Sequence, residues 1–351
     1  LGGGIALART GERHGARAGY GASVAAIVQT VAQIGPARVN GPLTQAISAP
    51  LMGVMQGRGA SRASRLAACL VLRMLHYALL TVIAVTIVVG GIDEYVATYD
   101  KVAGWLQILP TGKTAAIAFT IIGSLFYALV FSVLQTLVYE RALKRWPAEA
   151  ELPEAEPHVA RNRDAAPPRV WIALLYVVAA WIVLIAALDW VTLAVVGGSL
   201  VLLTVGTRAR KAGRSTWSIG LILAAVLTFT ALFPGIIGAV DFEPAAQRAV
   251  RAILLVLTAT WARAFAGTDG LREVARRILW RARAIPAAAE AAQITEHLES
   301  DTMLRPAATA LIARLKTVEL TPGPVADALT AWVAAEAAGY QRPGERGPVP
   351  A

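Results

Sequence analysis

The candidate functional residues of this chain are ionisable side chains that lie beside long apolar segments. Arg73 and His76 are three residues apart, so a helix would place them on one face, and Glu140 is expected at a similar depth in the next segment. A charge in a bilayer is costly unless it is paired or hydrated. The three residues would either form a polar cluster guarding a cytoplasmic vestibule or, in the interpretation we prefer, Arg73 would reach the headgroups and His76 would bond a neighbouring carbonyl.

A second group of ionisable residues is expected on the opposite side of the membrane. Asp189 lies in a connection so short that the apolar segments on either side of it must be antiparallel neighbours. Arg248 and Arg251 share a helical face near the end of a later apolar segment. An ion pair between Asp189 and Arg251 would tie two ends together, and the same residues would equally suit contact with a substrate. The sequence leaves these two roles open.

The middles of the apolar segments contain hydroxyl and amide side chains, such as that of Gln135, but no carboxylate. Carriers coupled to protons or sodium ions are commonly built on such a carboxylate, so its absence argues against that class. Pro234 and Gly235 are candidates for a kink or break in one helix, because proline removes a backbone hydrogen bond. We expect this break to be architectural.

Enzyme and cofactor motifs are not evident in the sequence. Cys69 is the only cysteine and the four histidines are scattered, so we expect no metal site. The segment "LPTGKTAA" at 109–116 lacks the first glycine of a phosphate-binding loop, whose place Gln107 takes. No zinc-protease or nucleophile-elbow motif occurs. We therefore predict no catalytic residue and no cofactor.

Two clusters of cations flank apolar segments. A formal net charge of +10 would suggest nucleic acid as a partner of a soluble protein, but cations beside apolar segments are better explained by membrane orientation. We therefore expect no nucleic-acid partner. Both clusters are expected to face the cytoplasm and to be candidates for contact with anionic lipids. They comprise Arg208, Arg210, Lys211, Arg214, Arg276, Arg277 and Arg281.

The elements that must position these residues are apolar helices. The chain has 351 residues, of which 56% are hydrophobic and 16% charged, whereas soluble domains are about 45–50% apolar and about 25% charged. A helix of about 20 apolar residues crosses a bilayer, and isolated strands leave backbone groups unpaired in lipid. We predict an all-α polytopic membrane protein with about six transmembrane helices, at 74–92, 114–139, 170–188, 190–205, 218–240 and 245–266.

Charge in the connections predicts the orientation. Lys and Arg concentrate at every second connection between the apolar segments. The positive-inside rule places these connections, and both termini, in the cytoplasm, with the chain in the inner membrane of a bacterial-type cell. Apolar positions at helical spacing in 19–35 and a basic face in 271–285 predict cytoplasmic amphipathic helices at both ends.

The predicted organisation has five parts. They are a cytoplasmic N-terminal segment at 1–65, transmembrane helices 1–2 at 66–139, a proline-rich acidic cytoplasmic linker at 140–169, transmembrane helices 3–6 at 170–266 and a cytoplasmic helical tail at 267–351. Residues 93–100, between the first two transmembrane helices, are expected to form a solvated interfacial loop.

Three functions fit this organisation. The preferred one is a non-catalytic membrane subunit that anchors or couples partner proteins, or copies of itself, in a larger assembly. A permease or channel component is the alternative, with Asp189, Arg251 and Pro234 as pathway candidates. A lipid-modifying enzyme is the least favoured, because no residues are nominated for its chemistry.

Overall fold

The computed structural model describes residues 2–34, 40–146, 168–207, 214–297, 311–319 and 321–340. Every regular element within these ranges is a helix, which confirms the predicted all-α class. Helical structure therefore satisfies the backbone groups of the apolar segments internally.

Three described helices are long and apolar enough to cross a membrane. They are α3 together with the π-helical turn η2 (Arg62–Val89), α5 (Lys113–Lys144) and α9 (Phe242–Arg281). Shorter apolar helices cover Val170–Ala186, Trp190–Gly206 and Gly220–Ile236. The chain thus has the helices of a membrane protein, and each predicted apolar segment coincides with one of these six.

α1 (Gly2–Ile34) and α2 (Asn40–Gly57) form a closely packed pair. A Cβ atom at Gly53 would lie 1.8 Å from the carbonyl oxygen of Ala8, so only glycine lets the two backbones approach there. α1 bends at Gly15, where φ is 81°. The pair therefore consists of a bent α1 and of α2, which contains Pro50, and the two helices approach each other through small residues.

α3 (Arg62–Ile83) continues directly into η2 (Ala84–Val89), and a glycine pair ends the helix. The next residues form α4 (Ile92–Leu106), so the prediction of a loop at 93–100 is wrong. The sequence carries acidic residues in the first turn of α4, where they interact favourably with the helix dipole, and this explains why a polar segment is helical. α5 then returns antiparallel to α3.

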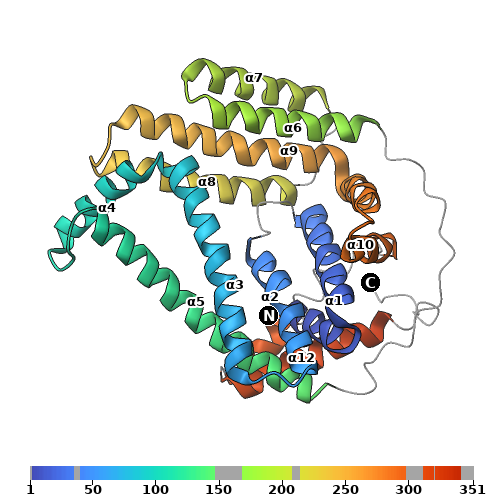
Figure 1. Ribbon diagram of the computed structural model, residues 1–351. Helices are drawn as coiled ribbons and strands as arrows, with labels where there is room; N and C mark the ends of the chain where they lie inside the picture. Colours follow the sequence, from blue (N-terminus) through green and yellow to red (C-terminus); the bar gives the residue numbers. More distant parts are fainter. Residues whose placement is uncertain are drawn as a thin grey trace.

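α6 (Pro168–Ala186), α7 (Trp190–Gly206) and α8 (Arg214–Ile236) pack around α9. The four helices lie side by side in the upper part of Figure 1. The indole N–H of Trp181 in α6 donates to the hydroxyl of Thr258 in α9 over 3.0 Å, which fixes the register of these two helices. α9 is interrupted at Gly267, next to the residue at which the last transmembrane helix is expected to end.

The α3–α5 pair and the α6–α9 bundle meet where η2 contacts α8 and α9, and they diverge from there (Figure 1). α1 and α2 lie between the diverging parts. α10 (Pro286–His297) and α12 (Pro322–Tyr340) both pack against α1, and α12 also packs against α5. We call α1, α2, α10 and α12 the helical base. Its helices come from both ends of the chain.

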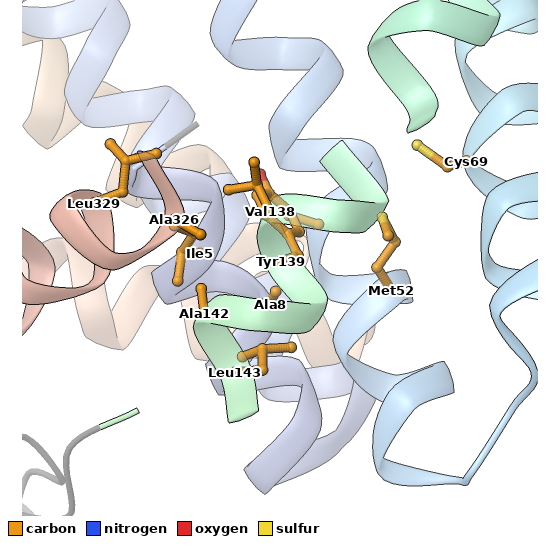
Figure 2. Close-up of a cluster of buried hydrophobic side chains, with 11 residues drawn as sticks. Ile5, Ala8, Met52, Cys69, Val138, Tyr139, Ala142, Leu143, Ala326 and Leu329 are labelled. Carbon is orange, nitrogen blue, oxygen red and sulfur yellow. The ribbon is translucent and has the colours of Figure 1, made fainter. Parts of the chain in front are cut away.

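The helical base shares one hydrophobic core with α3 and α5 (Figure 2). Apolar side chains from five helices bury one another there, so the N-terminal segment and the tail are parts of one packed unit. The core includes Ile5 and Ala8 of α1, Met52 of α2, Cys69 of α3, Tyr139 and Leu143 of α5, and Ala326 and Leu329 of α12.

The predicted linker at 140–169 begins too early, because α5 continues to Lys144. Most of the remaining linker, 147–167, lies outside the described residues. The boundary predicted after residue 65 is also shifted, since α3 begins at Arg62. The basic side chains at the end of α5 and at the start of α3 belong to these helices, because a membrane helix can carry cations on a terminal turn that lies outside the hydrocarbon.

Candidate functional site

The end of α3 is the most unusual stretch of backbone in the described part of the chain. In η2 the N–H groups of Gly90 and Gly91 both donate to the carbonyl oxygen of Val85, at 3.0 and 2.8 Å. The φ angles of these glycines are 108° and 128°, which L side chains rarely adopt. The carbonyl groups at this end of the helix, including those of Ile87 and Val89, are therefore left for other donors.

Two arginines of α9 supply these donors. Arg248 and Arg251 are only 4% and 6% exposed. Nη1 of Arg248 donates to the Val89 carbonyl oxygen over 2.7 Å, and Arg251 donates to that of Ile87. Arg248 also forms an ion pair with Glu94 in α4. A guanidinium group carries five donors in a fixed plane, so it suits a carbonyl and a carboxylate together.

We call this set of contacts the arginine clasp: Arg248, Arg251, Glu94 and the end of η2. It joins the α3–α5 pair to the α6–α9 bundle at the point where the two groups meet. Gly90 is essential to its geometry, because a Cβ atom there would lie 2.4 Å from Cζ of Arg248. The missing side chain therefore provides the space for the guanidinium group.

A second buried polar site lies where α2, α3 and α5 meet. Gln135 of α5 is fully buried, and its Oε1 accepts hydrogen bonds from Arg73 and, over 3.4 Å, from the Cys69 thiol. Its Nε2 donates to the Ser48 hydroxyl over 2.9 Å. The Arg73 guanidinium also lies over the Phe131 ring, 6.0 Å from the centroid. We call Arg73, Gln135, Ser48 and Cys69 the glutamine centre.

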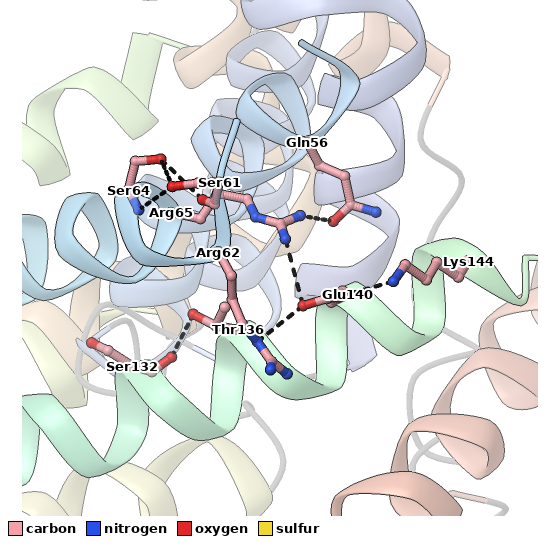
Figure 3. Close-up of polar contacts among 9 residues, drawn as sticks. All are labelled: Gln56, Ser61, Arg62, Ser64, Arg65, Ser132, Thr136, Glu140 and Lys144. Atoms are coloured by element: carbon pink, nitrogen blue, oxygen red, sulfur yellow. Dashed lines mark hydrogen bonds and ion pairs between the residues drawn. The ribbon is translucent and has the colours of Figure 1, made fainter. Parts of the chain in front are cut away.

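A third polar site lies at the same end of the α3–α5 pair as the glutamine centre (Figure 3). Glu140 pairs with three cations: Arg62 at 3.1 Å, Arg65 at 3.5 Å and Lys144 at 2.9 Å. Arg65 also donates to the side chain of Gln56 in α2. This cluster, which we call the Glu140 cluster, ties the helical base to α3 and α5. Three cations around one carboxylate leave a net positive charge at this end.

The predicted cluster of Arg73, His76 and Glu140 is therefore not formed. Glu140 binds Arg65 and Arg62, about two and three turns nearer the start of α3, while Arg73 binds Gln135 instead of a carboxylate or the headgroups. His76 is buried beside Tyr77, with ring centroids 5.8 Å apart. The reason is that α5 places the amide of Gln135, which also bonds Ser48 of α2, within reach of the Arg73 guanidinium.

The predicted ion pair between Asp189 and Arg251 is also not formed. Asp189 caps α7, accepting a 2.8 Å hydrogen bond from the N–H of Thr192 and a 2.7 Å bond from its hydroxyl. These bonds, the backbone one first, hold the pKa of Asp189 below its usual value. The charged cap is thus present above the usual carboxyl pKa and is lost as the pH falls through the lowered value.

Pro234 and Gly235 do not open the helix that contains them. α8 continues through Pro234 and ends at Ile236, so the proline occupies the last turn and not the middle. Gly235 faces α9, where an added Cβ would lie 2.8 Å from that of Ala245. Close contact between the two helices, and not a cavity, explains these residues.

The predicted lipid-binding cations fall into two sets. Arg208, Arg210 and Lys211 lie outside the described residues, and Arg214 is the first residue of α8. In α9, Arg276 and Arg277 both bind Glu273, at 2.8 and 2.7 Å, while Arg281 is exposed. Part of the basic face is therefore neutralised by an acidic neighbour on the same helix.

Sequence reasoning missed the partners of the buried arginines. Glu94 was assigned to a solvated loop, and Gln135 was recognised only as a polar group at depth. The signal that could have found the first was the Gly90–Gly91 pair after an apolar run, which is a helix C-terminus. The signal that could have found Gln135 was Arg73, an arginine expected at a similar depth in the neighbouring apolar segment.

Among the described residues no group of three or more His, Cys, Asp or Glu side chains is arranged to hold a metal ion. No family model matches the chain, and no curated protein or solved structure matches it. The function must therefore be inferred from the geometry of the three polar sites and from the arrangement of the helices.

Proposed function

We propose that this chain is a non-catalytic integral membrane subunit that anchors or couples partner proteins in a larger assembly. It would cross the inner membrane six times, with α3, α5, α6, α7, α8 and α9, and place both termini and the helical base in the cytoplasm. Anionic lipids would contact its cationic connections.

One observation carries the proposal: the buried charged residues bind groups of the same chain. The arginine clasp holds the end of a helix, and the glutamine centre holds Arg73 against an amide. Intramembrane charges usually mark an ion or substrate pathway, but here they are used to connect helices. Connection of helices is the role expected of a rigid anchoring subunit.

Two contacts between distant parts of the chain support the six-helix orientation. η2 and the start of α9, which the charge pattern assigns to the outer side, meet in the arginine clasp. At the other end, Nε of Arg263 donates to the Ala32 carbonyl oxygen of α1 over 3.2 Å, and both residues are assigned to the inner side. Ends predicted to share a side of the membrane are thus in contact.

The outer surfaces of α3 and α5 offer area for partners or lipid. Large apolar side chains such as Leu79, Phe126 and Leu129 are exposed along both helices. A contiguous exposed apolar surface marks contact with a membrane or with another protein. The helical base adds a polar surface that includes the exposed ion pair of Arg145 with Asp327.

Purification in a mild detergent tests the anchoring role. We expect the chain to co-purify with partner proteins, or with copies of itself, in a fixed ratio that survives a second purification step. The test variant is Phe126→Arg, which places a charge on the exposed face of α5 without touching the three polar sites. It should reduce the ratio of co-purified partner to this chain. A single monodisperse chain in every mild detergent would contradict the proposal.

A permease or channel component is the second candidate, favoured by the divergence of the two helical groups toward the inner side (Figure 1). Reconstituted vesicles would then show solute flux that Arg251→Gln alters, because Arg251 holds the point from which the groups diverge. Flux unchanged by Arg251→Gln would count against this candidate.

A further inference from the structure

A pocket of about 720 Å³ lies between α1, α2 and α5. Its walls include Gly3, Ala26 and Ile27 of α1, Ala46 of α2, and Phe131 and Leu134 of α5. The volume falls within the range of pockets that hold small ligands, which is about 300–1,000 Å³. None of the three polar sites described above needs this space.

The pocket is continuous with the lipid-facing surface of α5. Phe131 and Leu134 line it, and both remain partly exposed among the apolar side chains of α5. Leu134 lies five residues before position 139, where the second apolar segment is expected to leave the hydrocarbon, or about 8 Å along the helix. This is about a quarter of the hydrocarbon thickness of about 30 Å. The opening is therefore at the depth of the inner leaflet's acyl chains.

Gln45 supplies a hydrogen-bond donor to this apolar space. Its Oε1 accepts a 2.5 Å bond from the Tyr139 hydroxyl, which orients the amide. No described residue accepts from its Nε2, and Gln45 lines the pocket. Among the described residues that line the pocket, none carries a charged side chain. A charged headgroup would lose its hydration here without compensation, whereas an acyl chain with an ester carbonyl matches both the walls and the amide.

We propose that the α1–α2–α5 pocket binds one acyl chain of a membrane phospholipid, with the ester carbonyl oxygen accepting a hydrogen bond from the Gln45 amide. The headgroup would stay at the inner surface. This site goes beyond the anchoring role: it requires that α5 lie in the membrane but requires no partner protein. A bound lipid would complete the contact of the helical base with α5.

Photolabelling of the purified full chain in lipid vesicles tests the site. The probe is a phosphatidylglycerol with a diazirine on one acyl chain, in vesicles of phosphatidylglycerol and phosphatidylethanolamine. We expect labels at Ile27, Phe131 and Leu134. Gly3→Leu fills the pocket, since a Cβ there meets nothing within 4 Å, and should reduce these labels about tenfold, as expected when about two methylenes lose their burial.

The matched control is Gly123→Leu, a glycine of α5 outside the pocket where a Cβ also meets nothing within 4 Å. It should leave the labels unchanged. Ala26→Phe fills the pocket from another position of α1 and repeats the test if Gly3→Leu does not fold. Labels that neither pocket variant reduces, or that spread evenly along the exposed face of α5, would overturn the proposal.

The role of Gln45 has its own test. The wild-type chain should take up an ester-linked probe in preference to its ether-linked analogue, and Gln45→Leu should abolish the preference. Equal uptake of both probes by the wild-type chain would overturn the carbonyl contact. Labels in the pocket from a diazirine fatty acid, but not from the phospholipid probe, would show that the occupant is a free fatty acid and would overturn the lipid assignment.

Discussion

Gly90 shows how one missing side chain determines a contact between distant helices. The guanidinium group of Arg248 occupies the space that a Cβ at Gly90 would need, and it satisfies the carbonyl of Val89 there. The left-handed backbone of Gly90 and the arginine are thus parts of one arrangement.

We predict that Gly90→Ala lowers the stability of the membrane protein by more than backbone strain alone. A left-handed alanine costs about 1–2 kcal/mol, and displacing Arg248 would leave buried carbonyls unpaired at a further cost of about 1–3 kcal/mol. Thermal unfolding in detergent, followed by tryptophan fluorescence, measures the change. In an Arg248→Ala background the Gly90→Ala effect should shrink to the strain alone; an undiminished effect would refute the coupling.

Gln135 has a similar relation to Arg73. Removing the amide leaves a 3% exposed guanidinium without its acceptor. We predict that Gln135→Leu destabilises the chain by about 1–3 kcal/mol or more, and that the double variant Arg73→Met/Gln135→Leu costs less than the two single variants together. Unfolding measurements on the four chains give both quantities.

Ser132, one turn before Gln135, provides the control. Its hydroxyl is fully buried and is a hydrogen-bond donor to no described group. Ser132→Ala should therefore leave stability unchanged or raise it. A loss as large as that of Gln135→Leu would show that any polar change on this face of α5 is harmful, and the specific role of Gln135 would fail.

At the scale of the elements, apolar length was sufficient to predict six apolar helices, of which three are long and apolar enough to cross a membrane. It was insufficient for α4, because 93–100 contains several charged residues and its helicity is supported by the acidic first turn and by packing against α5. It was also insufficient for the helical base. The sequence predicts amphipathic helices at each end, but their mutual burial depends on contacts between residues far apart, such as Ile5 with Leu329.

The pairing of α1 with α2 depends on small residues. We predict that Gly53→Ala separates the two helices, since the added carbon would lie 1.8 Å from a backbone oxygen and backbone atoms move at a cost of about 1–3 kcal/mol. Hydrogen exchange should become faster in α1 and α2 but not in α9. Gly123→Ala, in open space on α5, is the control. Unchanged exchange in α1 would contradict the prediction.

At the scale of the whole molecule, the sequence predicts which helix ends share a side of the membrane but not how those ends are joined. Charge in the connections assigns sides of the membrane without any contact. The structure adds the arginine clasp and the helical base, and their contacts depend on side chains such as Glu94 and Gln135 that carry no motif. Sites built from single residues on separate helices leave no local pattern to detect.

The arrangement in the membrane is the claim on which both the anchoring role and the lipid pocket depend. Labelling of single cysteines in intact cells by a membrane-impermeant maleimide, in a Cys69→Ala background, measures it directly. Cysteines replacing exposed Ile108 and Phe242 should react from outside, whereas those replacing exposed Lys144 and Ile285 should react only after permeabilisation. Reaction of position 144 or 285 in intact cells would contradict the account.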